Sequence, residues 1–263
     1  MDKHVDERDY KLLESDKYTF YVLRRIIDGP YKLLLSDHER LVICFSTEPY
    51  PTWIWTPDDV TEEEMEKVYR LLVENNLMDK EHSFNLKYGL SDYIINRAQK
   101  DGINLSVRTN MFAYDCQNPI EPDKISEGEI CRCEMSDKEE LADFVEMFHE
   151  ETGVGQMDRK GCLEYAENKI NEGRTFFWKD SQGNHVASCS YNLKGELASI
   201  GLVYTRPEDR RKHYAENLVY QVTKMAEAEG CLPMLYTDAD YIASNACYEK
   251  IGYVLRGKLC SIE

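Results

Sequence analysis

The second half of the chain, residues 127–263, alternates between apolar residues at helical spacing and short apolar runs typical of strands. Ser136 and Glu139 have the spacing of a capping box, and a helical apolar stripe follows them. The predicted elements, in chain order, are a strand at 129–135, the capped helix after 136, a helix at 158–172, strands at 174–178, 185–191 and 197–204, a helix at 211–229, a strand at 233–237, a helix at 243–251 and a strand at 253–262. This order predicts a mixed α/β domain and by itself indicates no chemistry.

The first part of the chain, residues 1–117, has weaker periodicity. Its predicted elements are two strands within 31–45 around a turn at 36–39, a helix after a capping box of Thr61 and Glu64, a helix at 90–100 and an extended segment at 105–114. They predict a smaller α/β domain whose role stays open. Trp53 and Trp55 lie close together near prolines, and we expect buried aromatic packing there rather than a binding surface.

A polar segment at 118–128, with two prolines and a glycine, separates the two patterned parts. We therefore expect two domains, an α/β domain at 1–126 and an α/β (α+β) domain at 127–263. The sequence shows no repeat of fixed period.

Acidic residues dominate the charge, because 49 Asp and Glu oppose 32 Lys and Arg and the net charge at pH 7 is −17. Such a surface disfavours nucleic-acid binding and attracts cationic substrates such as amines. The chain has no apolar run of membrane-spanning length, and its first residues lack the apolar core of a secretory signal. We therefore expect a cytoplasmic protein with neither a nucleic acid nor a membrane as partner.

The nine cysteines are scattered and show no zinc-binding spacing. Cys131 and Cys133 are the closest pair, and in a strand both point to one face. We interpret them as structural thiols and expect no metal site. Reduced thiols also fit the cytosol.

Two segments resemble the GNAT superfamily of N-acetyltransferases. In 199–226, a strand, a short loop and a long helix follow one another, and the family's loop pattern is Arg/Gln-x-x-Gly-x-Gly/Ala. Arg210 and Ala215 match this pattern, whereas His213 stands where glycine is usual. In 234–254, a Ser-Asn pair leads to Tyr-Glu-Lys-Ile-Gly-Tyr, which matches the family's closing motif. The resemblance covers about half of the chain.

The resemblance implies a mixed sheet flanked by helices and transfer of an acetyl or longer acyl group from acetyl-CoA to an amine. A helix N-terminus offers free N–H groups and a positive dipole end, which suit the diphosphate of acetyl-CoA. The residues that the resemblance implies in cofactor binding are Val203, Tyr204, Thr205, Arg210, Arg211, Lys212, His213, Tyr214, Ala215 and Asn245. Backbone groups of Val203 and Thr205 would bind the pantetheine arm as an added strand does.

For catalysis, the resemblance implies that Tyr248 protonates the departing thiolate, the alternative being a tyrosine packed in the core. Glu196, at the start of the central strand, is our candidate general base, since the acceptor amine must lose a proton before it attacks. Asp238 and Asp240 are further carboxylates for this role.

The acceptor is expected to be a primary amine of a small molecule or peptide. A non-catalytic acyl-CoA-binding regulatory module is the alternative, and His213 in place of glycine favours it. The sequence leaves open the acceptor's identity, the acyl chain length and the oligomeric state, with a homodimer among the options.

Overall fold

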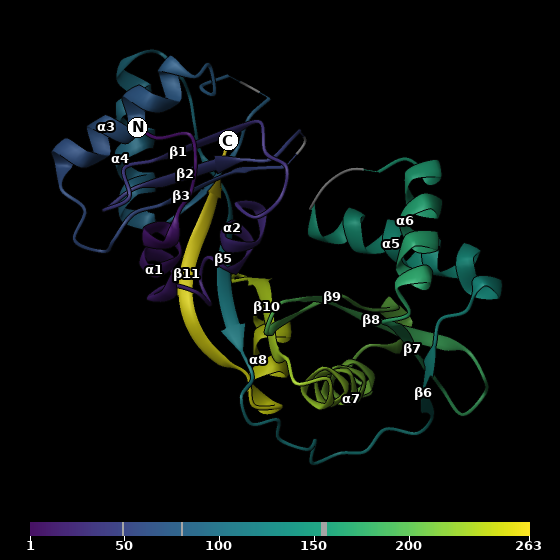
Figure 1. The fold of residues 1–263 in the computed structure, drawn as a ribbon. Coiled ribbons are helices and arrows are strands. Elements are labelled where there is room, and N and C mark those ends of the chain that lie inside the picture. Colours follow the sequence, from purple (N-terminus) through teal and green to yellow (C-terminus); the bar gives the residue numbers. More distant parts are fainter. Residues whose placement is uncertain (49, 80, 154–156) are drawn as a thin grey trace. The chain divides into compact units, whose positions relative to one another are not determined.

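The computed structural model describes residues 1–48, 50–79, 81–153 and 157–263, and within them the chain forms two compact units (Figure 1). Unit 1 consists of Met1–Tyr114, Tyr236–Tyr241 and Leu255–Glu263, and unit 2 of Asp115–Leu235 and Ile242–Val254. The division therefore differs from a single cut between residues 126 and 127.

The chain's last segment belongs to unit 1 because its side chains lie in that unit's core. Cys260 and Ile262 pack with the apolar residues on one face of the unit 1 sheet, and Leu259 packs on the other face. Main-chain hydrogen bonding adds to this, because Cys260 pairs with Leu86 in an antiparallel ladder. Sequence periodicity contains no information about such a return of the chain.

Unit 1 contains a mixed sheet with helices on both faces (Figure 1). Its elements are α1 (Glu7–Glu14), α2 (Tyr21–Ile26), β1 (Leu33–Ser36), β2 (Val42–Phe45), β3 (Thr52–Trp55), α3 (Glu62–Glu74), β4 (Phe84–Leu86), α4 (Tyr88–Lys100), β5 (Val107–Asp115) and β11 (Val254–Ile262). The strand order is β1-β2-β3-β4-β11-β5. β1, β2 and β3 are antiparallel neighbours, β3 and β4 are parallel, and β4 and β11 are antiparallel.

Alternation along β3 divides the two cores of unit 1. Ile54 lies in the core beneath α3 and α4, whereas Trp53 and Trp55 lie in the core with α1 and α2. Only 5% of Trp53 and 3% of Trp55 is exposed, which confirms the expected aromatic packing. The capping box of Thr61 and Glu64 at the start of α3 is also confirmed.

Unit 2 contains the predicted order of helices and strands (Figure 1). Its elements are β6 (Glu129–Arg132), a 3₁₀ turn η1 (Met135–Asp137), α5 (Lys138–Thr152), α6 (Arg159–Glu172), β7 (Thr175–Lys179), β8 (His185–Lys194), β9 (Leu197–Thr205), a 3₁₀ turn η2 (Pro207–Asp209), α7 (Tyr214–Ala228), β10 (Leu232–Asp238, which continues into unit 1) and α8 (Ile242–Lys250). β6, β7, β8 and β9 are antiparallel neighbours, and β9 and β10 are parallel.

Helices cover both faces of the unit 2 sheet. α5 and α6 share an apolar core with β7 and β9 on one face, and α7 lies against the other face (Figure 1). This arrangement confirms the expected mixed α/β fold with flanking helices. No helix among the described residues is both long enough and apolar enough to cross a membrane.

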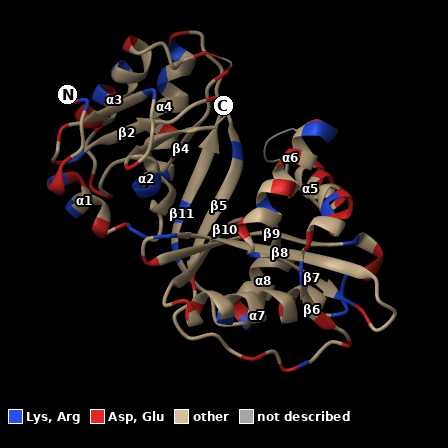
Figure 2. Ribbon diagram, turned by 45° about the vertical axis from the view of Figure 1, so that its right-hand side comes forward, with Lys and Arg blue, Asp and Glu red and all other residues tan. Residues whose placement is uncertain are grey.

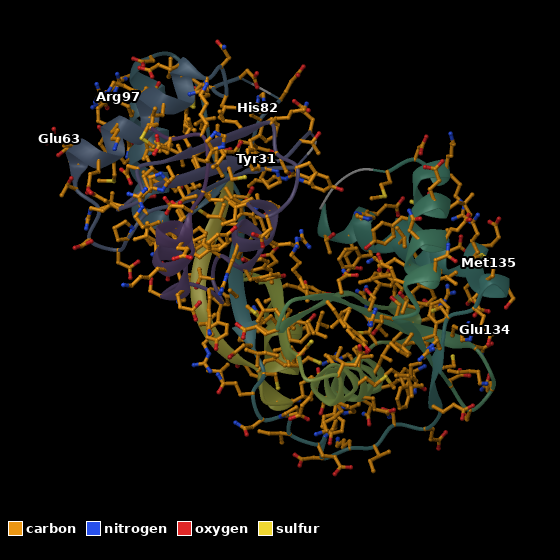
Figure 3. All side chains as sticks on the ribbon, viewed as in Figure 1. Tyr31, Glu63, His82, Arg97, Glu134 and Met135 are labelled. Carbon is orange, nitrogen blue, oxygen red and sulfur yellow. The ribbon has the colours of Figure 1, made fainter. Side chains whose placement is uncertain are left out.

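Two local predictions in unit 2 were wrong. The capping box is formed by Glu134 and Asp137 around η1 rather than by Ser136 and Glu139, because the turn precedes the helix (Figure 3 labels Glu134 and Met135). The long helix begins at Tyr214 rather than at 211. In unit 1, α1, α2, β3 and β4 had no clear signal in the sequence.

Candidate functional site

β9 contains a bulge that breaks its regular pairing with β8. Ser188 pairs with Tyr204 and Ser190 pairs with Gly201, so Leu202 and Val203 together oppose a single residue of β8. Leu202 has a φ of 50°, which is left-handed and unusual for a residue other than glycine. The extra residue changes the direction of the second half of β9.

Serine hydroxyls of β8 hold the carbonyl groups at this bulge. Ser188 Oγ donates to the Leu202 carbonyl at 2.8 Å, and Ser190 Oγ donates to the Gly201 carbonyl at 3.3 Å. Both serines are buried. The strained backbone is therefore fixed by side chains that the sequence analysis did not identify.

β9 and β10 are paired over only a short length. Their parallel register runs from Leu197 with Leu232 to Ser199 with Met234. Beyond Ser199, the described residues give β9 no partner on that side up to Thr205. Main-chain groups along this part of β9 are available to an added strand-like ligand.

α7 begins where the chain leaves β9 and η2, and its first turn leaves N–H groups open. The first intrahelical bond runs from Asn217 N to the His213 carbonyl at 3.1 Å, so the N–H groups of Tyr214, Ala215 and Glu216 have no acceptor in the helix. No side chain caps this terminus. The positive end of the helix dipole thus remains available to an anion.

His213 occupies the left-handed conformation that glycine adopts easily, with φ of 65° and ψ of 12°. Its Nδ1 lies 3.0 Å from Glu216 Oε2. The histidine therefore adopts a backbone conformation that suits glycine. Arg211, with φ of 65°, is a second left-handed residue in the same turn.

Three of the four basic residues around this turn are engaged by acidic partners. Arg206 Nη2 donates to Glu140 at 2.9 Å, and Lys212 Nζ donates to Asp209 at 2.8 Å. The hydrogen bond that Lys212 donates to Asp209 raises the pKa of Lys212. The partners of the third basic residue, Arg210, are Glu151 and the Thr205 carbonyl.

Arg211 is the exception among these cations. It is exposed, and within the described part of the chain no acidic group pairs with it. Its guanidinium group can therefore bind a ligand without first losing an ion pair.

A segment that precedes β6 anchors the start of α7. Ser126 Oγ donates to the Lys212 carbonyl at 2.8 Å. Asn217 Nδ2 donates to the carbonyls of Lys124 and His213, both at 2.9 Å. Residues that looked like a linker in the sequence thus hold the turn in place, which explains why they belong to unit 2.

A polar cavity of about 580 Å³ lies beside this turn, between η2 and the turn that joins β7 to β8. Arg206 and Lys212 both line it, together with their partners Glu140 and Asp209. Since these charges are already paired, the cavity offers an anion less than the start of α7 does.

The residues proposed on α8 share its buried face. Asn245 is 8% exposed and Tyr248 is 7% exposed. The Tyr248 ring packs edge to face against Tyr253, with 5.9 Å between ring centroids. Burial raises the pKa of the Cys247 thiol on the same helix to about 12, so Cys247 is a poor nucleophile.

Tyr204 contributes main chain rather than side chain to any site on β9. Its ring is buried in the core beneath α5, edge to face with Phe144 at 6.1 Å between centroids. Burial raises the pKa of its hydroxyl. The residue still places a peptide group on the open edge of β9.

Glu196 is not brought to the open part of β9. It is exposed in the turn between β8 and β9, next to the point where β9 and β10 pair. Val203 lies seven positions further along the extended strand, a distance of roughly 23 Å. The other two carboxylates, Asp238 and Asp240, belong to unit 1, where Asp240 accepts a hydrogen bond from Asn110 at 2.9 Å.

One group of described residues has metal-ligating side chains close together, and it lies in unit 1. It consists of Asp6, Asp9 and His38. His38 Nδ1 lies 2.7 Å from Asp9, and its Nε2 lies 2.8 Å from Asp2. Both ring nitrogens therefore contact carboxylates, an arrangement that fits a protonated imidazole better than a metal ligand.

Comparison with known proteins supports the reading of unit 2. Residues 141–253 match the model of the acetyltransferase (GNAT) family. No curated protein sequence matches the chain.

Several solved structures share the fold of nearly the whole chain. A GCN5-related N-acetyltransferase from Sphaerobacter thermophilus aligns at a TM-score of 0.63 with 13% identity, covering 92% of this chain and 84% of that chain. An acetyltransferase from the GNAT family of Colwellia psychrerythraea aligns at 0.60 with 12% identity, covering 98% and 97%. A GCN5-related N-acetyltransferase from Kribbella flavida aligns at 0.60 with 13% identity, covering 94% of each chain.

At these identities the structural likeness shows the fold alone. The family match falls on the residues that build the open strand edge and the exposed helix start, so the C-terminal half of the chain carries a GNAT acetyltransferase domain, of a family that transfers acyl groups from acyl-CoA.

Proposed function

We propose that unit 2 transfers the acetyl group of acetyl-CoA to a primary amine of a small molecule or peptide. The observation that carries this proposal is the junction of β9 and α7, where an unpaired strand edge leads through the short turn η2 to an uncapped helix terminus. An elongated ligand with an anionic centre and an amide-containing arm fits such a junction.

The start of α7 suits the diphosphate of acetyl-CoA. The N–H groups of Tyr214, Ala215 and Glu216 lack acceptors in the helix, and the left-handed His213 turns the chain so that a ligand can approach them. Arg211 adds a positive charge that no described acidic residue neutralises. Arg210 and Lys212 serve mainly to hold the turn through Glu151 and Asp209.

The open edge of β9 suits the pantetheine arm. Val203 and Thr205 would exchange main-chain hydrogen bonds with its amides, as a neighbouring strand would. When bound, acetyl-CoA supplies the activated thioester. An N–H group beside the bulge at Leu202 is fixed in direction by the serines of β8 and would polarise the thioester carbonyl.

Tyr248 is the residue that we assign to protonation of the thiolate. It shares the buried face of α8 with Asn245, which would orient the pantetheine or a water molecule. The distant position of Glu196 removes it from this scheme. Proton removal from the amine is then left to a group of the bound complex or to water.

The acidic surface favours an amine as acceptor. Acidic residues are distributed over both units (Figure 2), and the net charge of −17 draws cationic molecules toward the protein. The regulatory alternative rested on His213. Because His213 adopts the conformation expected of glycine, that objection to cofactor binding is weakened.

An amine panel with release of the CoA thiol as the readout tests the proposal. The purified full chain with acetyl-CoA should release thiol faster when an acceptor such as a polyamine, an amino acid or an N-terminal peptide amine is added. The product should gain one acetyl group by mass. Binding of acetyl-CoA without amine-dependent release over the whole panel would favour a regulatory module instead.

A further inference from the structure

We propose that unit 1 is a second copy of the fold of unit 2, in which side chains fill the counterpart of the cofactor groove, so that one chain binds one acyl-CoA. This inference rests on the proposed function of unit 2. It starts from the order and the directions of the elements.

The order of elements is the same in the two halves of the chain. From α1 to β5, the chain runs through two helices, three strands, a helix, a strand, a helix and a strand. From α5 to β11, leaving aside the short 3₁₀ turn η2, it runs through the same nine elements in the same order.

The strand directions also agree. β1, β2 and β3 are antiparallel neighbours, as are β7, β8 and β9. After the next helix, β4 is parallel to β3, just as β10 is parallel to β9. Even the strand that precedes the first helix has a counterpart, because Asp2 forms an antiparallel bridge to Ser36 of β1 as β6 pairs with β7. Agreement in the order of the nine elements and in the directions of these strands is hard to reach without a common plan.

The corresponding strands stop pairing at corresponding places. β3 and β4 pair through Trp53 with Asn85, and β9 and β10 pair through Ser199 with Met234. From the last paired residue to the first residue of the next helix, unit 1 needs nine positions, from 53 to 62, and unit 2 needs fifteen, from 199 to 214. The extra positions in unit 2 are the open half of β9 and the turn before α7.

Two positions beyond the last paired residue of β3 and of β9, the two units carry side chains of very different size. Unit 2 has Gly201, and a Cβ built there would meet no atom within 4 Å. Unit 1 has Trp55, which is 3% exposed. The open space of unit 2 is thus replaced in unit 1 by an indole ring.

Polar groups complete the filling of unit 1. Trp55 Nε1 donates to Asp16 Oδ2 at 2.9 Å, and Lys87 Nζ donates to the same oxygen at 2.7 Å. Lys87 lies two positions beyond Asn85 on the β4 side, and it also reaches Asp58 at 2.6 Å. Asp16 therefore joins the two diverging strands where a ligand would otherwise lie.

The helix that follows is closed to an anion as well. Thr61 Oγ1 accepts from Glu64 N at 3.3 Å, and Glu64 accepts from Thr61 N at 2.7 Å. Glu62, Glu63 and Glu64 occupy the first turn of α3, and Glu63 lies on its outer side (Figure 3). Three carboxylates and a side-chain cap stand where unit 2 has the free N–H groups of α7 and the unpaired Arg211 in the turn before it.

Titration calorimetry and hydrogen exchange on the full chain test this inference, with acetyl-CoA as the probe. We expect one equivalent bound, and slower exchange at 206–217 with no change at 56–64. A second equivalent, or protection at 56–64, would overturn the inference while leaving the proposed function intact. No heat and no protection in either segment would overturn the proposed function together with the single-site count.

Two variants distinguish the residues that fill the groove of unit 1 from those that bind acetyl-CoA in unit 2. Asp16→Asn removes the charge that joins Trp55 to Lys87, and we expect a lower melting temperature with less than a twofold change in the dissociation constant of acetyl-CoA. Arg211→Glu places a carboxylate in the unit 2 turn and should weaken binding at least tenfold without altering the melting temperature of the free protein. Weaker acetyl-CoA binding in Asp16→Asn than in Arg211→Glu would contradict the assignment of the site to unit 2.

Discussion

The helices α3 and α7 follow the same kind of strand in the two units, yet they begin in opposite ways. α3 starts with a threonine cap and three glutamates, and α7 starts after a left-handed histidine with no side-chain cap. A capped acidic terminus stabilises its own helix, whereas an uncapped terminus among arginines keeps its N–H groups for a ligand. The shared order of helices and strands thus puts a helix start beside a strand end in both units. The residues of the turn before that helix then decide whether its N-terminus can bind an anion.

Packing follows the same division. Unit 1 uses Trp55, Asp16 and Lys87 to close the gap between its diverging strands, and unit 2 leaves its gap beside Gly201. The filled gap of unit 1 favours the stability of that unit. The open edge of β9 in unit 2 instead leaves polar main-chain groups that can hydrogen-bond a ligand. Variants that remove the filling side chains of unit 1 or the binding groups of unit 2 test this division of roles.

The largest effect is expected from Trp55→Ala. Loss of a buried tryptophan should lower the free energy of unfolding by about 3–5 kcal/mol, because the cavity cannot be refilled by its neighbours. Urea denaturation measures this. The folded fraction should still bind acetyl-CoA with unchanged affinity, and a parallel loss of affinity would mean that the filled groove takes part in binding.

Tyr248→Phe should reduce kcat by about 100-fold, since removal of a general acid typically costs that much. The dissociation constant of acetyl-CoA should stay the same because the ring remains. Tyr191→Phe is the matched control, because it also removes a buried tyrosine hydroxyl of unit 2, one bonded to Glu229. An unchanged kcat in Tyr248→Phe would refute the acid role.

Arg211→Ala should weaken acetyl-CoA binding about tenfold, the value of one charge-assisted hydrogen bond. Arg132→Ala, which removes an exposed arginine from β6, should leave binding unchanged. Calorimetry at low and high salt distinguishes the two, because only the Arg211 contribution should shrink as salt screens the diphosphate. Equal affinities for both variants would show that the open cation of the turn is not used.

His213 tests whether backbone geometry or side-chain chemistry matters in the turn. His213→Gly should retain acetyl-CoA affinity within about threefold because glycine adopts φ of 65° without strain. His213→Val should weaken it by about tenfold, since a β-branched residue pays roughly 1–2 kcal/mol in this conformation. Calorimetry on both variants decides the matter, and equal losses would indicate a direct role for the imidazole.

The smallest effect is expected in the pH dependence of stability that His38 of unit 1 contributes. The hydrogen bond to Asp9 raises the pKa of His38 with a further contribution from Asp2, while burial of the ring and, to a lesser degree, Arg8 oppose the shift. A raised folded-state pKa means that this stabilisation is complete below about 6.5, the usual unfolded value, and is lost as pH rises through the folded pKa.

Melting temperatures between pH 5 and pH 9 measure this loss. His38→Asn is a matched control because asparagine tolerates the left-handed φ of 61° at this position and does not titrate. Asp6 lies within 3.8 Å of the ring and stays in both proteins. A fall with rising pH that persists in His38→Asn would assign the effect to other groups.

Local patterns predicted most elements of unit 2 and six of the ten described elements of unit 1, where α1, α2, β3 and β4 were missed. Helical spacing and capping residues located α6 and α3, because such signals act within a few residues. They misplaced the start of α7, since residues 211–213 carry helix-compatible side chains but two left-handed backbone angles. Of the candidate site, the motif residues at 203–205 and 210–215 lie at the β9–α7 junction, Asn245 and Tyr248 share the buried face of α8, and Glu196 lies at the far end of its strand.

The sequence alone determined the family resemblance, the acidic charge and the residues at the β9–α7 junction, because these depend on residue type and short spacing. Three features required the folded molecule to be seen: residues 255–263 complete the first unit, serines of β8 hold the bulge, and Asp16 accepts hydrogen bonds from both Trp55 and Lys87. The repeated plan was invisible in the sequence because a fold constrains the direction and burial of its strands, and many different side chains satisfy those constraints.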